Sequence, residues 1–406
     1  MRLIFLILLI SPILCFGQLE NSWTKKQVFG GGKRERAVAF SIGNYGYIGT
    51  GVNTSDTVLN DFWKYNPIND TWTQVANLPG VARRDAVGFA IENYGYCGMG
   101  IDHDEAFNGA KLHDFYQYNP TLNSWAPKAD FPGVDTAGVY FATAFTIQNK
   151  GYICGGKKGP NSYSNELWEY KPSVDTWTQR ANFPGGVRFQ MSSFSIGNFG
   201  IVGWGGDQNN YRKDVWKYNS GNNVWTALGN FPGSERVGAC SFVLNEIGYI
   251  CLGNNGGLLT DLWGYDFSND TWHVAATYTG NPRKNAVSFV VNGKAYVGTG
   301  KTYSGKNREM YEYSPGQYLG LDETKTVQVN LFPNPTSENI TIQLSKELAS
   351  SKLSIHNSIG QLVLKQTINN ESFIQLNLHQ LQAGFYTVNI HDANNQLIYT
   401  NELIRL

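Results

Sequence analysis

Residues 37–51 read AVAFSIGNYGYIGTG: a short apolar stretch that carries Phe40, a turn at Gly43, and a second apolar stretch that runs into glycines. This pattern occurs six times along the chain, with 47 to 56 residues between successive copies of the phenylalanine. A repeat of about 50 residues is typical of propeller blades, each of which is a small antiparallel sheet. The repeated phenylalanines are Phe40, Phe89, Phe145, Phe194, Phe242 and Phe289.

Each unit contains four strand signals. The quoted stretch supplies the first two, and the third follows as an acidic, an apolar, an aromatic, any residue and then Tyr, as in DFWKY at residues 61–65. The fourth begins at a tryptophan such as Trp72, after an Asn/Asp turn whose residues suit tight backbone geometry. The acids that open the third strands are Asp61, Asp114, Glu166, Asp214, Asp261 and Glu309.

The tryptophan strand is displaced at one end of the array. Five units have a tryptophan after their own third strand, whereas the last unit stops at Tyr313 without one. The sixth tryptophan, Trp23, lies ahead of the first unit. An N-terminal strand that completes the last blade would pair the otherwise open edges of the ring. The sequence therefore predicts an all-β, six-bladed propeller over residues 18–315.

Charge and the N-terminal segment limit the classes of partner. The chain has 32 basic and 32 acidic side chains and no basic cluster, which argues against a nucleic-acid partner. Residues 1–17 contain Arg2, an apolar run at residues 3–13 and a cleavage site before Gln18, and they predict a signal peptide. Leu14 ahead of Cys15 argues against a lipid anchor. We expect an exported mature chain without a transmembrane span.

Four cysteines remain after the predicted signal peptide. Cys154 and Cys251 fall where other units have glycine, so these positions require a small residue, and we expect buried thiols. Export permits disulfides, and Cys240 with Cys251 is the one candidate pair. We expect these two residues to lie diagonally on neighbouring strands.

The composition changes after the last unit. Residues 316–326 are predicted to be a linker, and residues 327–406 alternate apolar and polar side chains in seven short segments. Seven strands in about eighty residues indicate a small immunoglobulin-like β-sandwich. The segments are residues 327–332, 339–344, 352–357, 361–366, 373–378, 384–392 and 396–404.

Parts of the chain resemble two known families. Paired glycines such as Gly155 and Gly156, followed by the aromatic-x-Tyr element and the tryptophan, resemble the kelch repeat of galactose oxidase-like propellers. In other units one residue often separates the two glycines, as at Gly98 and Gly100. In the tail, LFPNPT (331–336), IGQ (359–361) and LQAGFY (381–386) resemble the sorting domain of Bacteroidetes type IX secretion. This resemblance implies the type IX machinery as a partner and a secreted or outer-membrane surface location, but an address does not reveal the cargo's chemistry.

The first strands suggest a binding face. Five units carry an arginine just before strand one, and the third unit has Val139 followed by Tyr140. In kelch propellers this register lines the mouth of the central channel, so the resemblance implies guanidinium groups that receive an acidic ligand. The alternative is that each arginine pairs with a neighbouring acid or a backbone carbonyl within the blade. The recurrent acids would then hold the backbone amides of a loop or an arginine. The arginines are Arg34, Arg83, Arg188, Arg236 and Arg283.

The loops between strands two and three differ most between units, and we expect specificity to lie there. Tyr163, Tyr211 and Tyr303 occupy these loops and are candidates for stacking against a sugar. The acidic loop at residues 101–107 lacks the frame of an EF-hand, so we predict a solvated loop and no metal site.

The resemblance to kelch propellers suggests two enzymatic activities. Galactose oxidase needs copper ligands, and the propeller has only His103, His113 and His273, so this activity is rejected. Some kelch propellers are sialic acid mutarotases with channel-facing Arg and Glu, but Glu35, Glu92 and Glu235 are not equivalent positions. No cofactor is predicted and no catalytic residue can be assigned. We predict a binding module for a glycan or a protein. A mutarotase-like isomerase and a structural or adhesive surface protein are the alternatives.

Overall fold

The computed structural model describes residues 21–103, 109–133, 138–315, 329–348, 350–357, 361–392 and 397–406. The predicted signal peptide, the linker and residues 104–107 of the acidic loop lie outside these ranges. The chain divides into two compact units, Met1–Gln317 and Tyr318–Leu406. Throughout the described residues the regular elements are strands, and no helix there is long and apolar enough to cross a membrane.

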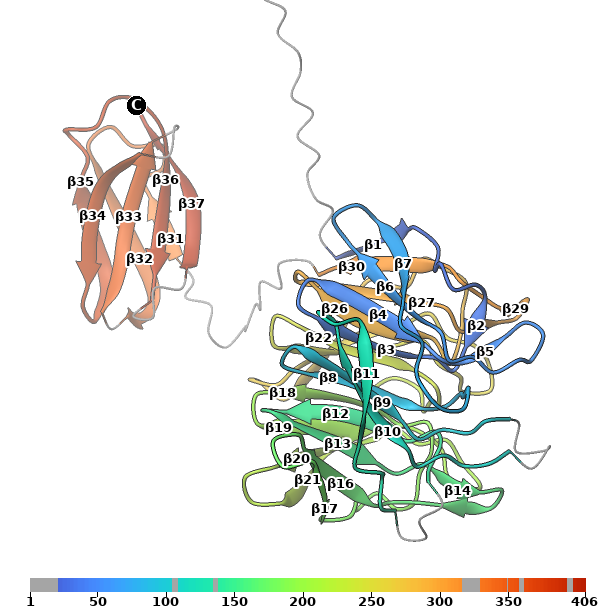
Figure 1. Cartoon of the computed structure of the whole chain (residues 1–406). Coiled ribbons are helices and arrows are strands. Elements are labelled where there is room, and N and C mark those ends of the chain that lie inside the picture. The colour runs from blue at the N-terminus through green and yellow to red at the C-terminus, as the bar shows by residue number, and fades with distance from the viewer. Residues whose placement is uncertain are drawn as a thin grey trace, which may run out of the picture. The chain divides into compact units, whose positions relative to one another are not determined.

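The first unit is a ring of four-stranded antiparallel sheets, and the described residues form six of them (Figure 1). The first three blades are built from β3 (Val38–Ile42), β4 (Tyr45–Gly49), β6 (Phe62–Asn66) and β7 (Thr71–Val75); β8 (Val87–Ile91), β9 (Tyr94–Gly98), β10 (Phe115–Asn119) and β11 (Ser124–Lys128); and β12 (Thr143–Ile147), β13 (Lys150–Cys154), β16 (Leu167–Lys171) and β17 (Thr176–Arg180).

The other three blades follow the same order. They are built from β18 (Ser192–Ile196), β19 (Phe199–Gly203), β20 (Asp214–Asn219) and β21 (Val224–Asn230); β22 (Cys240–Leu244), β23 (Ile247–Cys251), β24 (Leu262–Asp266) and β25 (Thr271–Val274); and β26 (Val287–Val291), β27 (Lys294–Gly298), β30 (Met310–Ser314) and β1 (Ser22–Lys26). The first strands of neighbouring blades contact one another around the whole ring, from β3 through β8, β12, β18 and β22 to β26 and back to β3.

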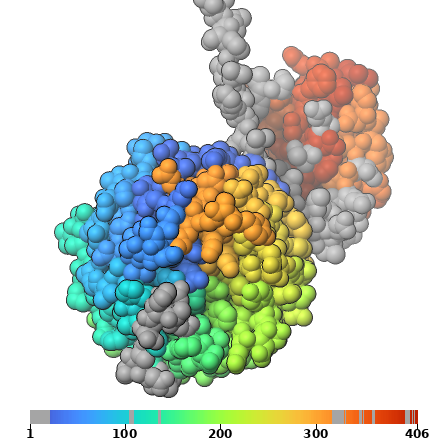
Figure 2. All heavy atoms as spheres, turned by 90° about the vertical axis from the view of Figure 1, so that its right-hand side faces the viewer, coloured from blue at the N-terminus to red at the C-terminus, as the bar shows by residue number. Residues whose placement is uncertain are grey.

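The N-terminal strand closes the ring, as predicted. β1 pairs with β30 along its whole length, and Trp23 lies opposite Tyr313. The indole Nε1 of Trp23 donates a hydrogen bond of 2.8 Å to the carbonyl oxygen of Ala276. Figure 2 shows the result on one face, where the colours run in chain order round the disc and the last blade lies beside the first.

The repeated phenylalanine and the Gly-Tyr pair have a joint packing role. Within a blade, Phe145 stacks on Tyr152 with ring centres 5.2 Å apart. Between blades, the phenylalanine lies over the glycine of the next blade. A Cβ on Gly46 would lie 2.1 Å from the Phe289 ring, and a Cβ on Gly200 would lie 2.3 Å from Phe145. The missing Cβ permits this approach in five of the six blades, whereas blade six has Ala295 at the glycine position.

The cysteines are buried free thiols, as expected. Burial raises the pKa of the Cys97 thiol to about 12, so it is protonated and unreactive at neutral pH. The expected diagonal placement of Cys240 and Cys251 is wrong, because they are directly opposite each other in the β22–β23 hairpin. The two-residue turn at Asn245 and Glu246 sets this register.

The second unit is a sandwich of two antiparallel sheets, and all seven predicted strands are present. Its sheets have the orders β31-β32-β35 and β34-β33-β36-β37, with a buried core that includes Ile342, Leu353 and Val388. The strands are β31 (Val329–Phe332), β32 (Asn339–Leu348), β33 (Ser351–Asn357), β34 (Leu362–Ile368), β35 (Glu371–Asn377), β36 (Gly384–His391) and β37 (Leu397–Arg405).

Candidate ligand-binding site at the channel mouth

Six residues, one from each blade, form a ring just before the first strands; we call it the mouth ring. Each donates its backbone N–H to the carbonyl oxygen of its counterpart in the adjacent blade, and the six bonds of 2.9–3.3 Å close on themselves. Every member has φ between 50° and 61°, a region that favours glycine, yet five members carry side chains. Such strained positions often serve function. The members are Arg36, Asp85, Phe141, Gln190, Gly238 and Asn285.

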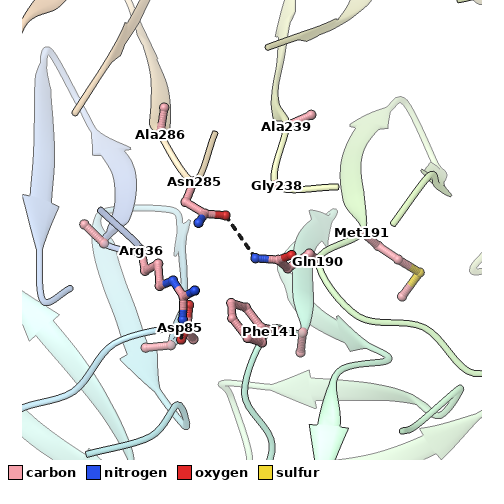
Figure 3. Close-up of a pocket in the computed structure, with 12 residues that line it drawn as sticks. Arg36, Asp85, Phe141, Gln190, Met191, Gly238, Ala239, Asn285 and Ala286 are labelled. Carbon is pink, nitrogen blue, oxygen red and sulfur yellow. Dashed lines mark hydrogen bonds and ion pairs between the residues drawn. The ribbon is translucent and has the colours of Figure 1, made fainter. Parts of the chain in front are cut away.

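The mouth ring surrounds a cavity of about 130 Å³. Figure 3 shows the side chains of its members gathered around this space from different blades. Gln190 donates from Nε2 to Oδ1 of Asn285 at 3.0 Å. Asn285 in turn donates from Nδ2 to Glu35 at 2.9 Å. The amide orientations are therefore fixed by hydrogen bonds before any ligand arrives.

Arg36 and Asp85 give the cavity its charge. Arg36 Nη1 lies 3.2 Å from Asp85 Oδ2, and its guanidinium carbon lies 4.8 Å from the centre of the Phe141 ring. Arg84 Nε lies 3.5 Å from the same Asp85 oxygen. Burial raises the pKa of Asp85 to about 6, although the two guanidinium groups act in the opposite direction.

Asp85 makes the stability of the protein depend on pH in an identifiable way. Its folded pKa of about 6 exceeds the ordinary value of 3.8, so its stabilising contribution is complete below about pH 4 and is lost as the pH rises through 6. Asp85→Asn removes this loss. We expect the unfolding free energy of the variant, relative to wild type, to rise by about 2 kcal/mol between pH 4 and pH 7.5. Urea unfolding at both pH values tests this, and parallel curves would contradict it.

A second set of charged groups lies one residue earlier, in three of the blades. This set contains the buried Glu35 and the half-buried Arg84 and Lys284. Burial lowers the pKa of the Lys284 ammonium, while Glu35 opposes that shift. The two sets together contain three cations, Arg36, Arg84 and Lys284, and two carboxylates, Glu35 and Asp85. The mouth is therefore cationic on balance, and more so when Asp85 is protonated.

The five predicted arginines lie behind this mouth, inside the blades. Each is at most 3% exposed, and each donates from Nη1 to a carbonyl oxygen sixteen residues later. Each also pairs with the acid of the third strand at 2.5–3.0 Å. The prediction that the recurrent acids fix an arginine is thus confirmed for Arg34, Arg83, Arg188, Arg236 and Arg283. Internal pairing was the alternative to ligand contact, and it favours a structural role for these five side chains.

Blade three replaces its missing arginine with another cation. Val139 occupies the arginine position, and Glu166 instead accepts from Lys158 Nζ at 2.7 Å. Lys158 belongs to the ribbon of β14 (Lys157–Gly159) and β15 (Ser162–Tyr163). The retained acid without its arginine was the sequence signal that a substitute cation was needed.

The four predicted tyrosines differ in accessibility. Tyr140 is buried, at 2% exposure, and its ring packs on Phe141 with ring centres 5.4 Å apart. Tyr163 is half-buried and stacks on Phe189 with centres 5.5 Å apart. Tyr211 is 39% exposed and Tyr303 is 76% exposed, and the Tyr303 hydroxyl accepts a bond of 2.8 Å from the Leu258 N–H. Three of the four thus remain near the surface of the mouth face.

Sequence reasoning missed the mouth ring itself. Its members lie two residues after the arginine position, where an otherwise regular repeat presents six different residues. That divergence was a usable signal, because framework positions keep one residue type while ligand positions vary.

Among the described residues, no group of three or more His, Cys, Asp or Glu side chains could hold a metal ion. Asp102 uses its Oδ1 to accept from the Ala110 N–H at 2.6 Å, which fixes the base of the acidic loop. Asp104 and Glu105, the other acids of that loop, lie outside the described residues.

Comparison with protein families assigns both units. The KLHDC2/KLHL20/DRC7 Kelch-repeats domain matches residues 101–300, and the Kelch motif matches residues 46–79. The Secretion system C-terminal sorting domain matches residues 330–404. The solved structure of YjhT is similar to 70% of this chain over 95% of its own length, with a TM-score of 0.55 and 17% identity. At this identity the likeness concerns the fold.

Two curated relatives are ulvan lyases. Ulvan lyase NLR42 of Nonlabens ulvanivorans is 31% identical over 86 residues, which are 21% of this chain and 16% of that protein. The endo-acting ulvan lyase of Formosa agariphila is 26% identical over 101 residues, 24% of this chain and 19% of that protein. This chain therefore spans less than a fifth of either relative. A match of that length is too short to cover the propeller.

Proposed function

Because the chain is a kelch-repeat protein that ends in a secretion system C-terminal sorting domain, we propose that it is an exported binding module whose channel mouth receives an acidic saccharide. The sorting domain directs it to the medium or to the outer-membrane surface through type IX secretion. One observation carries the proposal. Polar side chains from four blades meet beside one aromatic ring in a single cavity.

The residue types suit a sugar. The amides of Gln190 and Asn285 offer donors and acceptors for hydroxyl groups, and Phe141 offers an apolar face for a pyranose ring. Arg36 suits a carboxylate because guanidinium presents two parallel donors. The cavity of about 130 Å³ holds only one terminal group of a glycan, so the rest of the ligand would contact the loops outside it. Tyr163, Tyr211 and Tyr303 belong to those loops.

Thermal stability of the purified chain tests this function. A ligand that binds only the folded state raises the melting temperature. We expect N-acetylneuraminate or D-glucuronate to raise it, D-glucose and D-galactose to leave it unchanged, and Arg36→Ala with Gln190→Ala to reduce the rise. Lys365→Ala, which removes an exposed cation of the second unit, serves as the control. If no sugar raises the melting temperature, the mouth serves a protein partner or a structural role instead.

A sugar isomerase is the second candidate, and one observation favours it. Asp85 has a pKa of about 6 and lies 3.2 Å from Arg36, so a carboxyl group able to exchange protons near neutral pH lines the cavity. Mutarotation needs only such proton exchange at the anomeric hydroxyl and the ring oxygen. Anomer interconversion followed by NMR should be accelerated by the wild type and not by Asp85→Asn. Equal rates in both would leave the binding function alone.

A further inference from the structure

A second concave site lies at the opposite end of the propeller strands, between blades three and four. Its volume is about 540 Å³, and the turns that connect strands one and two and strands three and four contribute to its wall. We propose that this groove binds a saccharide through a carboxylate or sulfate group. We call it the Lys150 groove, after the ammonium group in its wall.

A buried acid holds two cations in this wall. Glu169 is 3% exposed and accepts from Arg180 Nη2 at 2.8 Å, from Arg180 Nε at 3.1 Å and from the Tyr152 hydroxyl at 2.7 Å. The Lys150 ammonium lies 3.0 Å from Glu169 Oε1. These contacts lower the pKa of Glu169, although its burial acts in the opposite direction. One carboxylate thus fixes two cations, and the cluster keeps a net positive charge.

Both cations retain donors for a ligand. The side chains of Arg180 and Lys150 are 29% and 30% exposed, and both line the groove. Arg180 uses Nε and Nη2 for Glu169, so among the described residues its Nη1 hydrogens have no acceptor. A lysine ammonium has three donors, of which Glu169 takes one. A carboxylate or sulfate would satisfy these remaining donors.

The rest of the lining consists of five amide side chains together with Ser220 and Gly221, and it contains no carboxylate. Asn198 accepts from Gln148, and Asn219 holds the backbone of its own turn, so these amides are already oriented. Asn222 is exposed and makes no hydrogen bond within the described part of the chain. Several amides around two fixed cations fit the hydroxyl groups and the acid group of one sugar. The volume lies in the range of about 300–1,000 Å³ that small-molecule sites occupy.

Blade six contains a matched ionic cluster that serves as an internal control. Glu312 lies 3.2 Å from Lys294 and 3.5 Å from Lys26, and it accepts from the Tyr296 hydroxyl at 2.8 Å. Lys294 and Lys150 each begin the second strand of their blade, and Glu312 and Glu169 share the third-strand register. If the blade-three cluster were only framework, changing either lysine would have the same consequence. The groove predicts a ligand effect for Lys150 alone.

Ligand-observed NMR titrations of the full chain test the proposal. The probes are D-glucuronate, D-glucose 6-sulfate and D-glucose, and the background is Arg36→Ala/Gln190→Ala, which removes the contribution of the channel mouth. We expect one or both acidic sugars to bind more tightly than D-glucose. Lys150→Ala should weaken that binding at least tenfold and Asn222→Ala severalfold, whereas Lys294→Ala should leave it unchanged.

Each outcome either supports or contradicts saccharide binding in the Lys150 groove. Preference for glucuronate assigns a carboxylate ligand, and preference for the sulfate ester assigns a sulfated one. Equal binding of D-glucose overturns the proposal, and so does equal weakening by Lys150→Ala and Lys294→Ala. Asn222→Ala keeps the test valid if changes in the ionic cluster impair folding, because Asn222 does not contact that cluster. The mouth background separates this result from the proposed function, which can fail while the groove binds.

Discussion

Deletion of residues 21–28 is expected to lower the melting temperature of the propeller by about 10 °C or more. β1 supplies the outer strand of the last blade and pairs with β30 at five positions. Its removal exposes the faces of Tyr278 and Tyr313, on which Trp23 packs with ring centres 4.9 and 5.0 Å away. Loss of a buried tryptophan alone costs about 3–5 kcal/mol, and about 2–4 °C accompanies each kcal/mol in a large domain.

The deletion also opens the edge of β30, which can then pair with other chains. A chain that begins at Asn21 is the control and should melt as the parent does. Trp23→Ala and Trp125→Ala provide a second comparison, because each indole donates to a carbonyl oxygen of the adjacent blade. Both should destabilise similarly, and the deletion should exceed either. Calorimetry measures the three differences, and an unchanged melting temperature after deletion would contradict closure by β1.

Much of the propeller could be predicted because repetition multiplies weak signals. A single residue such as Phe40 or Gly46 carries little information about the fold. The whole pattern, repeated six times at similar spacing, predicts the blade and the positions of its strands. The displaced Trp23 then revealed which strand closes the ring. The structure adds the reason for the pattern, since five of the six phenylalanines occupy the space that a Cβ on the next blade's glycine would need.

The candidate site could be predicted only in part, and the arginines show why. Recurrence of Arg236 and its equivalents was read both as a ligand register and as a framework register, and sequence alone contains no burial to separate them. The residues that line the cavity, such as Arg36 and Asp85, do not recur, so the repeat pattern does not indicate them. The Lys150 groove could not be predicted from the sequence, because its walls come from turns some seventy residues apart.

Arg236→Ala is expected to destabilise the propeller by about 3–5 kcal/mol, because it empties the space of a fully buried side chain and removes the donor of a buried carbonyl oxygen and of the partly exposed Asp261. Arg236 is fully buried and lies 2.6 Å from Asp261. It also donates to the carbonyl oxygens of Leu252 and Ser234 at 3.1 Å each, and its guanidinium carbon lies 5.0 Å from the centre of the Phe231 ring. Asp261 would keep only the Trp263 indole, at 2.9 Å, as a side-chain donor.

Two variants separate a framework role from a binding role for Arg236. Arg36→Ala removes a guanidinium that is 24% exposed and leaves Arg84 beside Asp85, so it should destabilise the protein less than Arg236→Ala while it weakens ligand binding. Arg236→Met with Asp261→Asn removes both charges of the buried pair, and its cost should be smaller than that of Arg236→Ala. Urea unfolding at pH 7.5 measures all three. A stable Arg236→Ala protein that has lost its ligand would restore the arginine register as the binding site, because a buried framework charge cannot be removed without cost.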